Sequence, residues 1–239
     1  MVHEQHPDVR LMAQDVNHGF AAANNMGLRH AQGRYVFILN PDTEVVPGAL
    51  AGLTRYLDEH TDVAMAAPML TNPDGSYQNG QVRSDPKLLP EIMTIIKVNH
   101  VMPSLKLFSK YYRTDFDPKR EQDVDQIMGA AMFVRKSALD RIGNFDERFF
   151  LWFEEVDLCL RFRKAGERIR YVPSFQIVHH GGQSFNQRQP AERQLIHNRS
   201  RIYFFQKHHS AVATSILRVV SPIGLLASYI YQKLHHGRS

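Results

Sequence analysis

Two unbroken apolar runs constrain the fold of this chain more than any other feature of its sequence. Residues 35–39 read Tyr-Val-Phe-Ile-Leu, and residues 127–134 read Ile-Met-Gly-Ala-Ala-Met-Phe-Val. A strand with one face in solvent alternates apolar and polar residues, whereas an unbroken run is typical of a strand buried on both faces of a mainly parallel sheet. The runs therefore predict a sheet that is covered on both sides.

Helical patterns separate these strands along the chain. Residues 19–31 are rich in alanine and are followed by Gly33, a usual helix-ending residue. Pro47 stands where a second helix begins, and leucines recur on one face of that helix up to residue 60. Further strands are expected at 63–67, 170–173 and 175–179, and further helices at 137–143 and 153–165. The sum predicts an α/β fold with helices layered on a mainly parallel sheet.

Composition limits the number of domains and the kinds of site. The 239 residues are 43% hydrophobic and 22% charged, which fits one globular domain, or one domain and a tail. The single cysteine, Cys159, excludes a disulfide framework and a multi-cysteine zinc site and favours a reducing compartment. The first twenty residues contain no apolar core of the kind that signal peptides have, so we expect a cytoplasmic protein.

The basic charge is concentrated at the C-terminal end. Residues 193–239 hold seven Lys or Arg and no acidic residue, and the remaining residues carry −2 of the total net charge of +5. The cations flank an apolar run, residues 219–231, which favours an anionic membrane over nucleic acid. That run has 13 residues and contains Pro222, whereas a membrane span needs about 20 apolar residues. We expect a domain over 1–205 and a tail over 206–239 that lies on the inner face of the cell membrane. The alternative is that the apolar run 219–231 is one more core helix.

A turn follows the first buried strand, Asn40-Pro41-Asp42-Thr43. Ligands bind beyond the carboxyl ends of strands in open α/β sheets, so Asp42 stands where a carboxylate can hold a metal and a diphosphate. The alternative is a structural turn in which Asn40 and Asp42 satisfy the backbone.

Three carboxylates mark the start of the helix expected at 153–165: Glu154, Glu155 and Asp157. The helix dipole alone would favour acidic residues there. However, five apolar residues precede the pair, four of them aromatic, so at least one carboxylate is expected to border an apolar cleft that tunes its pKa for work as a base.

A histidine ends the last expected strand, in Ile177-Val178-His179-His180-Gly181-Gly182. An isolated histidine at a strand end is usually a satisfied surface or core residue. Combined with Asp42, His179 has the makeup of a mixed oxygen and nitrogen site for a divalent ion, for which Mg²⁺ or Mn²⁺ is expected in the absence of thiolates.

Together these segments resemble the family 2 glycosyltransferases of the rhamnosyltransferase-like branch. The resemblance covers about residues 7–203. The matching motifs are Asn17-His18-Gly19-Phe20-Ala21-Ala22-Ala23-Asn24-Asn25-Met26-Gly27, Asn40-Pro41-Asp42-Thr43, Gly129-Ala130, Phe153-Glu154-Glu155-Val156-Asp157-Leu158 and His179-His180-Gly181-Gly182. The fold that the resemblance implies is the GT-A type, a nucleotide-binding α/β sheet.

The resemblance also implies roles for single residues. Asn40 and Asp42 take the places of the first and last carboxylates of a metal-binding turn, and His179 completes that site. Glu155 is the expected base, although many relatives have Asp there, which leaves the choice between Glu154 and Glu155 open. Asp157 would orient the helix or an acceptor hydroxyl. The substrate-binding residues would be Asn17, Gly19, Asn24, Asn40, Gly129, Trp152 and Asp157.

The implied reaction is a single displacement with inversion at the sugar. The donor would be a nucleoside-diphosphate sugar, dTDP-rhamnose by analogy, and the acceptor a cell-wall or lipid-linked glycan. A divalent ion would stabilise the leaving diphosphate while a carboxylate takes the proton of the acceptor hydroxyl.

The start of the chain departs from the family pattern. Members normally have a strand, a helix and a second strand before the segment that begins at Asn17, and here only sixteen residues precede it. We expect roughly 40 to 60 residues to be missing, the size of a βαβ unit with its lead-in. A catalytically inactive remnant that acts as a binding protein is therefore the main alternative. A pyrophosphorylase-like enzyme is disfavoured, because no Gly-rich, Lys-bearing loop follows a first strand.

Overall fold

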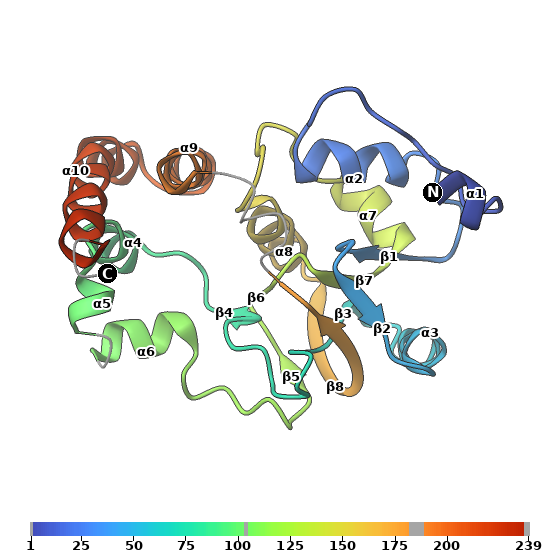
Figure 1. The fold of residues 1–239 in the computed structure, drawn as a ribbon. Helices are drawn as coiled ribbons and strands as arrows, with labels where there is room; N and C mark the ends of the chain where they lie inside the picture. Colours follow the sequence, from blue (N-terminus) through green and yellow to red (C-terminus); the bar gives the residue numbers. More distant parts are fainter. Residues whose placement is uncertain (1, 103–104, 182–188, 237–239) are drawn as a thin grey trace.

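A central sheet with helices on both faces forms the body of the protein in the computed structural model, which describes residues 2–102, 105–181 and 189–236 (Figure 1). The strand order is β1 (Tyr35–Leu39), β7 (Ala131–Arg135), β3 (Val63–Thr71), β8 (Arg168–His179) and β2 (Thr43–Val45), with β5 (Gln122–Asp123) paired to β8. The α/β class that the apolar runs predicted is confirmed.

The sheet is mixed, so the expectation of a mainly parallel sheet is wrong. Strands β3 and β8 are parallel, while β1 with β7, β3 with β7, β2 with β8 and β5 with β8 are all antiparallel. Unbroken apolar runs report burial on both faces, which a covered antiparallel strand shares with a parallel one. In β7, Met132 and Val134 pack on one face and Phe133 on the other.

Helices α2 (Phe20–Leu28), α7 (Lys136–Ile142) and α8 (Glu154–Lys164) cover one face of the sheet, and α3 (Ala49–Glu59) covers the other. Leu53 and Leu57 of α3 are fully buried, whereas Leu50 is 51% exposed. A short helix, α1 (Val2–Gln5), precedes these elements. The two expected strands at 170–173 and 175–179 form the single strand β8, whose pairing with β3 is irregular after Pro68.

The second apolar run does not form one strand. Gln126–Ile127 is β6, which pairs with β4 (Val82–Arg83) in a separate two-stranded sheet, and the chain then turns before β7 begins at Ala131. Backbone amides hold the turn: Met128 donates to Gln81, and Asn40 donates to Ala130. The small residues at the centre of the run, Gly129 and Ala130, therefore belong to a turn between two sheets.

Four helices form a second layer beside the sheet: α4 (Leu88–Ile95), α6 (Lys106–Tyr112), α9 (Pro190–His208) and α10 (Ala211–His236). We call them the helical wall; α5 (Val98–Val101) lies between α4 and α6 in sequence. A second core joins this wall to the start of α8, through Ile95, Phe149, Phe153, Val156, Phe204, Phe205, Ala213 and Leu217. The domain boundary placed at 205/206 falls inside α9, and Ala213 and Leu217 of the expected tail belong to this core.

Helix α10 has two different faces. Its inner face packs on α9 and α4. A Cβ on Gly224 would come within 2.3 Å of the side chain of Ile95 on α4. Its outer face exposes apolar residues at alternating spacings of four and three: Val212, Ile216, Val219, Ile223 and Leu226, each 37–69% exposed. We call these five residues the outer stripe. None of the helices described is both long and apolar enough to cross a membrane.

Candidate active site

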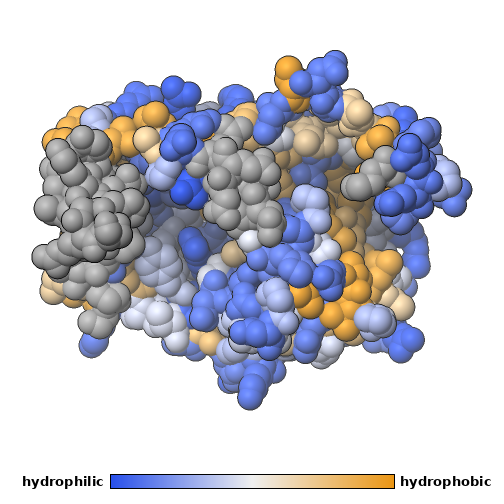
Figure 2. Space-filling model, viewed as in Figure 1, coloured by the Kyte–Doolittle hydropathy of each residue, from blue (hydrophilic) through white to orange (hydrophobic). Residues whose placement is uncertain are grey.

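A cavity of about 570 Å³ lies between the body of the protein and the helical wall. Figure 2 shows the surface hollowed there, with hydrophilic residues in its depth. The lining comes from the β1 and β8 strand ends, from β4 and β6, from the start of α8, and from α4, α6 and α9. Elements from both cores therefore converge on one space.

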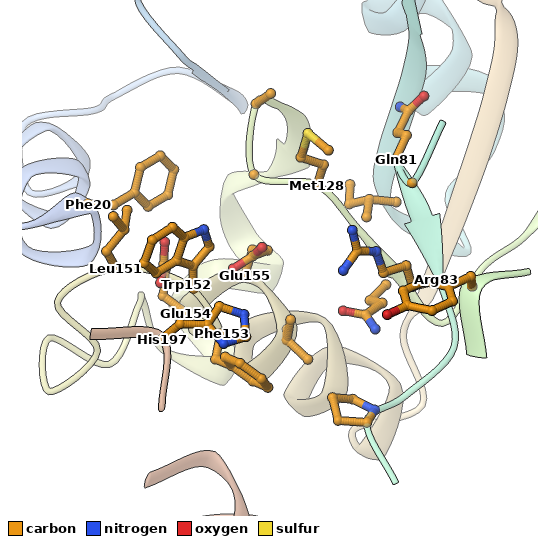
Figure 3. Close-up of a pocket in the computed structure, with 18 of the residues that line it drawn as sticks. Phe20, Gln81, Arg83, Met128, Leu151, Trp152, Phe153, Glu154, Glu155 and His197 are labelled. Carbon is orange, nitrogen blue, oxygen red and sulfur yellow. The ribbon is translucent and has the colours of Figure 1, made fainter. Parts of the chain in front are cut away.

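Glu154 and Glu155 open α8 at the floor of this cavity (Figure 3). The two residues before them, Trp152 and Phe153, have φ angles of 65° and 69°. Bulky residues rarely adopt this left-handed conformation, which persists only where the surrounding structure enforces it. Here Phe153 is held in the second core. The carboxylate pair is thus fixed by a sharp backbone turn.

Glu154 is buried and Glu155 is half-buried, and the pKa values of both are raised. The Oε2 atoms of Glu154 and Glu155 are shielded from solvent and have no hydrogen-bond partner among the described residues. Burial, and then the charge of Glu155, raise the pKa of Glu154 well above its ordinary value. Burial also raises the pKa of Glu155, but the charge of Arg83 acts in the opposite direction. The pKa of Glu154 is therefore raised further than that of Glu155, so Glu154 holds a proton more tightly than Glu155 does.

Gly129 lets the turn after β6 approach this pair. A Cβ at position 129 would lie 3.3 Å from the ring of Phe20 and 3.6 Å from the Cβ of Glu155. The glycine therefore leaves room for Phe20 and Glu155 beside the cavity.

His179 and Asp42 meet at the carboxyl ends of β8 and β1. The Nε2 atom of His179 is 3.3 Å from Oδ1 of Asp42 and 3.4 Å from Nδ2 of Asn40. On the other side of the ring, Nδ1 donates to Oε1 of Gln78 at 2.7 Å. A partner that accepts from Nδ1 makes Nε2 the nitrogen with the lone pair, as in a metal-binding histidine, and here that lone pair faces the Asn40 amide.

This donor set fits a divalent ion that is shared with a substrate. Within the described ranges no group of three or more His, Cys, Asp or Glu side chains comes together as a metal site. Mg²⁺ is usually held by one or two carboxylates and completes its shell with water and substrate phosphates. Asp42 and His179 supply such a partial set, and His179 and Asn40 also line the cavity.

The other residues expected to bind substrate separate into two groups. Trp152, like Gly129 and Asn40, lines the cavity, whereas Asn17, Gly19 and Asn24 do not. The Oδ1 atom of Asn17 accepts from the Gly19 amide, and Asn24 donates to the carbonyl of Phe20, so both side chains act locally at the start of α2. Gly19 has φ 86°, and a Cβ there would meet the Phe150 carbonyl at 2.2 Å. These residues dock α2 against the loop before α8.

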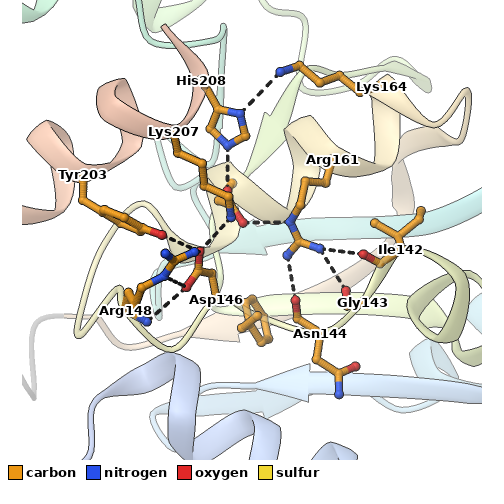
Figure 4. Close-up of polar contacts among 12 residues, drawn as sticks. Ile142, Gly143, Asn144, Asp146, Arg148, Arg161, Lys164, Tyr203, Lys207 and His208 are labelled. Atoms are coloured by element: carbon orange, nitrogen blue, oxygen red, sulfur yellow. Dashed lines mark hydrogen bonds and ion pairs between the residues drawn. The ribbon is translucent and has the colours of Figure 1, made fainter. Parts of the chain in front are cut away.

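Asp157 faces away from the cavity, contrary to its inclusion among the substrate-binding residues. It accepts from Arg161 at 2.8 Å and from His208 at 2.7 Å, and Lys207 lies 2.7 Å away. Figure 4 shows Arg161, Lys207 and His208 gathered in one polar cluster. Burial alone would raise the pKa of Asp157, but the bonds from His208, Lys207 and Arg161 outweigh it and lower the pKa. This placement favours its other expected role, the orientation of α8, because it ties α8 to α9.

Several cavity residues have no counterpart among the sequence predictions. They are Phe20, Gln78, Arg83, His197 and Arg201. His197 packs between Trp152 and Phe153, with ring centroids 5.3 and 5.4 Å away, and burial together with the charges of Arg201, Arg83 and Lys97 lowers its pKa well below the ordinary value. Phe20 lies inside a motif quoted above, but no local pattern marks the others, because long-range packing brings them to the cavity.

Comparison with known proteins gives consistent matches. The family model described as glycosyl transferase family 2 matches residues 1–143. The chain is 29% identical over 218 residues to the N-acetylglucosaminyl-diphospho-decaprenol L-rhamnosyltransferase of Mycobacterium tuberculosis, covering 87% of this chain and 70% of that protein. It is 28% identical over 180 residues to the rhamnosyltransferase WbbL of Escherichia coli K12, covering 70% of this chain and 64% of that one.

Among solved structures, the mannosyltransferase PcManGT from Pyrobaculum calidifontis, in complex with GDP-Man and Mn²⁺, matches with a TM-score of 0.49 and 17% identity. The match covers 99% of this chain and 60% of that one.

Proposed function

The chain belongs to glycosyl transferase family 2, as its motifs predicted, and we propose that its cavity transfers a sugar with inversion from a nucleoside diphosphate to an acceptor hydroxyl. The observation that carries this proposal is the Glu154–Glu155 pair, which is fixed at the floor of the cavity with one shielded oxygen on each carboxylate that has no partner among the described residues. A buried carboxylate with a raised pKa is suited to accept a proton near neutral pH.

In this reaction Glu155 removes the proton of the acceptor hydroxyl, and the hydroxyl oxygen attacks the anomeric carbon of the donor. The bond to the diphosphate breaks in the same displacement, so the configuration at that carbon inverts. Asp42 and His179 would hold Mg²⁺ or Mn²⁺, which supplies charge neutralisation for the leaving diphosphate. Cys159 has no part in the reaction, because it is fully buried and burial raises the pKa of its thiol to about 12.

We propose dTDP-rhamnose as the donor and a lipid-linked or cell-wall glycan as the acceptor. The names of two relatives support rhamnose, and one of them also names a sugar on a diphospho-lipid. The test offers the purified chain a panel of nucleoside-diphosphate sugars with an N-acetylglucosaminyl-diphospho-prenol acceptor. Product with inverted configuration from dTDP-rhamnose supports the proposal. Transfer from another donor alone would reassign the sugar, and no transfer from any donor would contradict the function.

Removal of divalent ions is expected to abolish transfer, because the leaving diphosphate would then lose its charge compensation. Excess chelator should stop turnover, and added Mn²⁺ or Mg²⁺ should restore it. Asp42→Asn should raise the Mn²⁺ concentration needed for half-maximal activity by about tenfold, a typical effect on metal affinity at such sites. His180→Gln is the matched control, since His180 bonds to the exposed Glu44 instead. Activity that survives the chelator unchanged would overturn the metal assignment.

We also propose that the protein is cytoplasmic and attaches to the inner face of the cell membrane through α10. This proposal does not rest on the basic charge of residues 193–239, because several of those cations already have partners within the protein. Arg201 pairs with Glu91, Lys207 with Asp146, and Arg218 donates to Gln206. The outer stripe is the stronger feature, since it presents five apolar side chains in a row on one helix face.

Binding to anionic liposomes is expected to fall by about tenfold or more when Val219 and Ile223 of the outer stripe are both replaced with serine, because two shallowly buried apolar side chains are lost. Both residues are exposed, so the fold should be retained. Leu50→Ser on α3, which is also exposed, is the matched control. Sedimentation with vesicles at low and high salt measures the effect. Equal binding by the wild type and the double variant would exclude the outer stripe as the attachment site.

A further inference from the structure

Arg83 is a cation of the cavity without an anionic partner. It ends β4, and no hydrogen bond or ion pair to a described residue reaches its guanidinium. Its Nε atom is shielded from solvent and unsatisfied. A shielded cationic donor that has no partner is costly, so its persistence at a cavity points to an anionic ligand.

The structure holds the guanidinium in place instead of leaving it free to move. Its central carbon lies 5.5 Å from the ring centroid of Tyr112, as in a cation–π contact. A Cβ at position 80 would come within 3.2 Å of the Nη2 atom of Arg83, so Gly80 leaves the space that the guanidinium occupies. In Figure 3 the side chain of Arg83 reaches into the cavity toward Glu155 from the opposite side.

Nearby carboxylates are committed to other partners. Glu91 accepts from Arg201 at 2.5 Å and from the Tyr111 hydroxyl at 2.6 Å. Asp85 accepts from Arg163. Neither acid is therefore free to neutralise Arg83. Glu155 feels the charge of Arg83 across the cavity but forms no ion pair with it in the described part of the chain.

The position of Arg83 indicates which substrate it meets. Its ring contact is with α6, and its charge lowers the pKa of His197 on α9, so it belongs to the side of the cavity that the helical wall forms. The same wall includes α10, which packs on α4 through Gly224 and turns the outer stripe outward. A molecule with an anionic group and a long apolar chain would match both features of the wall. Asp42 and His179, by contrast, lie at the strand ends of the sheet.

We propose that Arg83 binds a phosphate group of a lipid-diphosphate acceptor and so positions the acceptor sugar over Glu155. This inference rests on the proposed glycosyltransferase function. A planar guanidinium suits the task, because it can give two parallel hydrogen bonds to one phosphate.

Direct binding tests the site without turnover. Inorganic pyrophosphate is titrated into the full chain in the presence of excess chelator, which removes the metal-dependent donor site. Arg83→Gln should weaken this binding at least tenfold, and Arg83→Lys, which keeps the charge, should give an intermediate loss. Arg55→Gln should have no effect, because Arg55 is an exposed residue of α3. Thermal melting of each variant confirms that it is folded. Equal pyrophosphate binding by the wild type and Arg83→Gln overturns the proposal, whether or not the transfer reaction is ever observed.

Kinetics then separate the two diphosphates of the reaction. For an N-acetylglucosaminyl-diphospho-prenol acceptor, Arg83→Gln should raise the acceptor KM at least tenfold and leave the donor KM unchanged. With an alkyl N-acetylglucosaminide, which has no phosphate, the variant and the wild type should have the same acceptor KM. A rise in the donor KM instead would assign Arg83 to the donor and overturn the proposal.

Discussion

Glu155→Gln is expected to lower the rate of sugar transfer by about 10²-fold or more, because an amide cannot accept the proton of the attacking hydroxyl. The substitution keeps the size of the side chain and leaves Asp42 and His179 unchanged, so donor binding should persist. Transfer is measured by product formation and donor binding by calorimetry. The raised pKa of Glu155 also determines the expected pH profile. Because burial raises this pKa, activity should be lost on acidification at a higher pH than for an ordinary glutamate.

Glu154→Gln is the matched control for this experiment. Glu154 is the member of the pair whose pKa is raised further, and an uncharged amide resembles a protonated carboxyl in shape and charge. We therefore expect a much smaller loss of activity. If Glu154→Gln is the inactive variant and Glu155→Gln retains activity, the assignment within the pair is reversed.

Arg201→Met is expected to destabilise the fold by roughly 3–5 kcal/mol, the usual cost of removing one partner from a buried ion pair. The side chains of Arg201 and Glu91 are each 2% exposed and lie 2.5 Å apart. Arg201 also donates to Asn198 at 2.9 Å, so the substitution leaves a buried carboxylate and an amide oxygen without their main partner. Denaturant unfolding at neutral pH measures the loss.

Replacement of both partners provides the control. In Arg201→Met combined with Glu91→Gln no charge is left buried, so part of the lost stability should return. Arg199→Met, by contrast, removes an exposed cation from the same helix and should cost less. A cost for Arg201→Met no greater than that for Arg199→Met would show that the Glu91–Arg201 pair does not hold α4 to α9.

The sequence predicted the elements of the body well and their directions poorly. The apolar run at 35–39 and the leucine spacing in α3 located a strand and a helix, because burial leaves a local signature. Strand direction depends on how distant segments are connected in space, which no single run records. The run at 127–134 was misread for a related reason: Gly129 and Ala130 are as apolar as a strand interior, but they turn the chain past Phe20.

Site residues that belong to a motif could be predicted from the sequence, whereas residues that long-range packing brings to the cavity could not. Glu154, Glu155, Asn40 and His179 stood in recognisable motifs, and all four line the cavity. Arg83, which also lines the cavity, lies outside all of these motifs. The basic charge of residues 193–239 was counted without its partners, since Arg201 pairs with Glu91 and Lys207 with Asp146.

The left-handed backbone at Trp152 and Phe153 sets a limit on how this enzyme can be made more robust. Each such residue costs about 1–3 kcal/mol, and glycine would adopt the same conformation without that cost. At position 153, however, glycine would also remove a buried ring from the second core, a loss of about 3–5 kcal/mol that exceeds the strain released. At position 152 it would take the indole out of the cavity. Packing and the site therefore retain the strained turn, and heat-resistant variants have to be sought elsewhere in the chain.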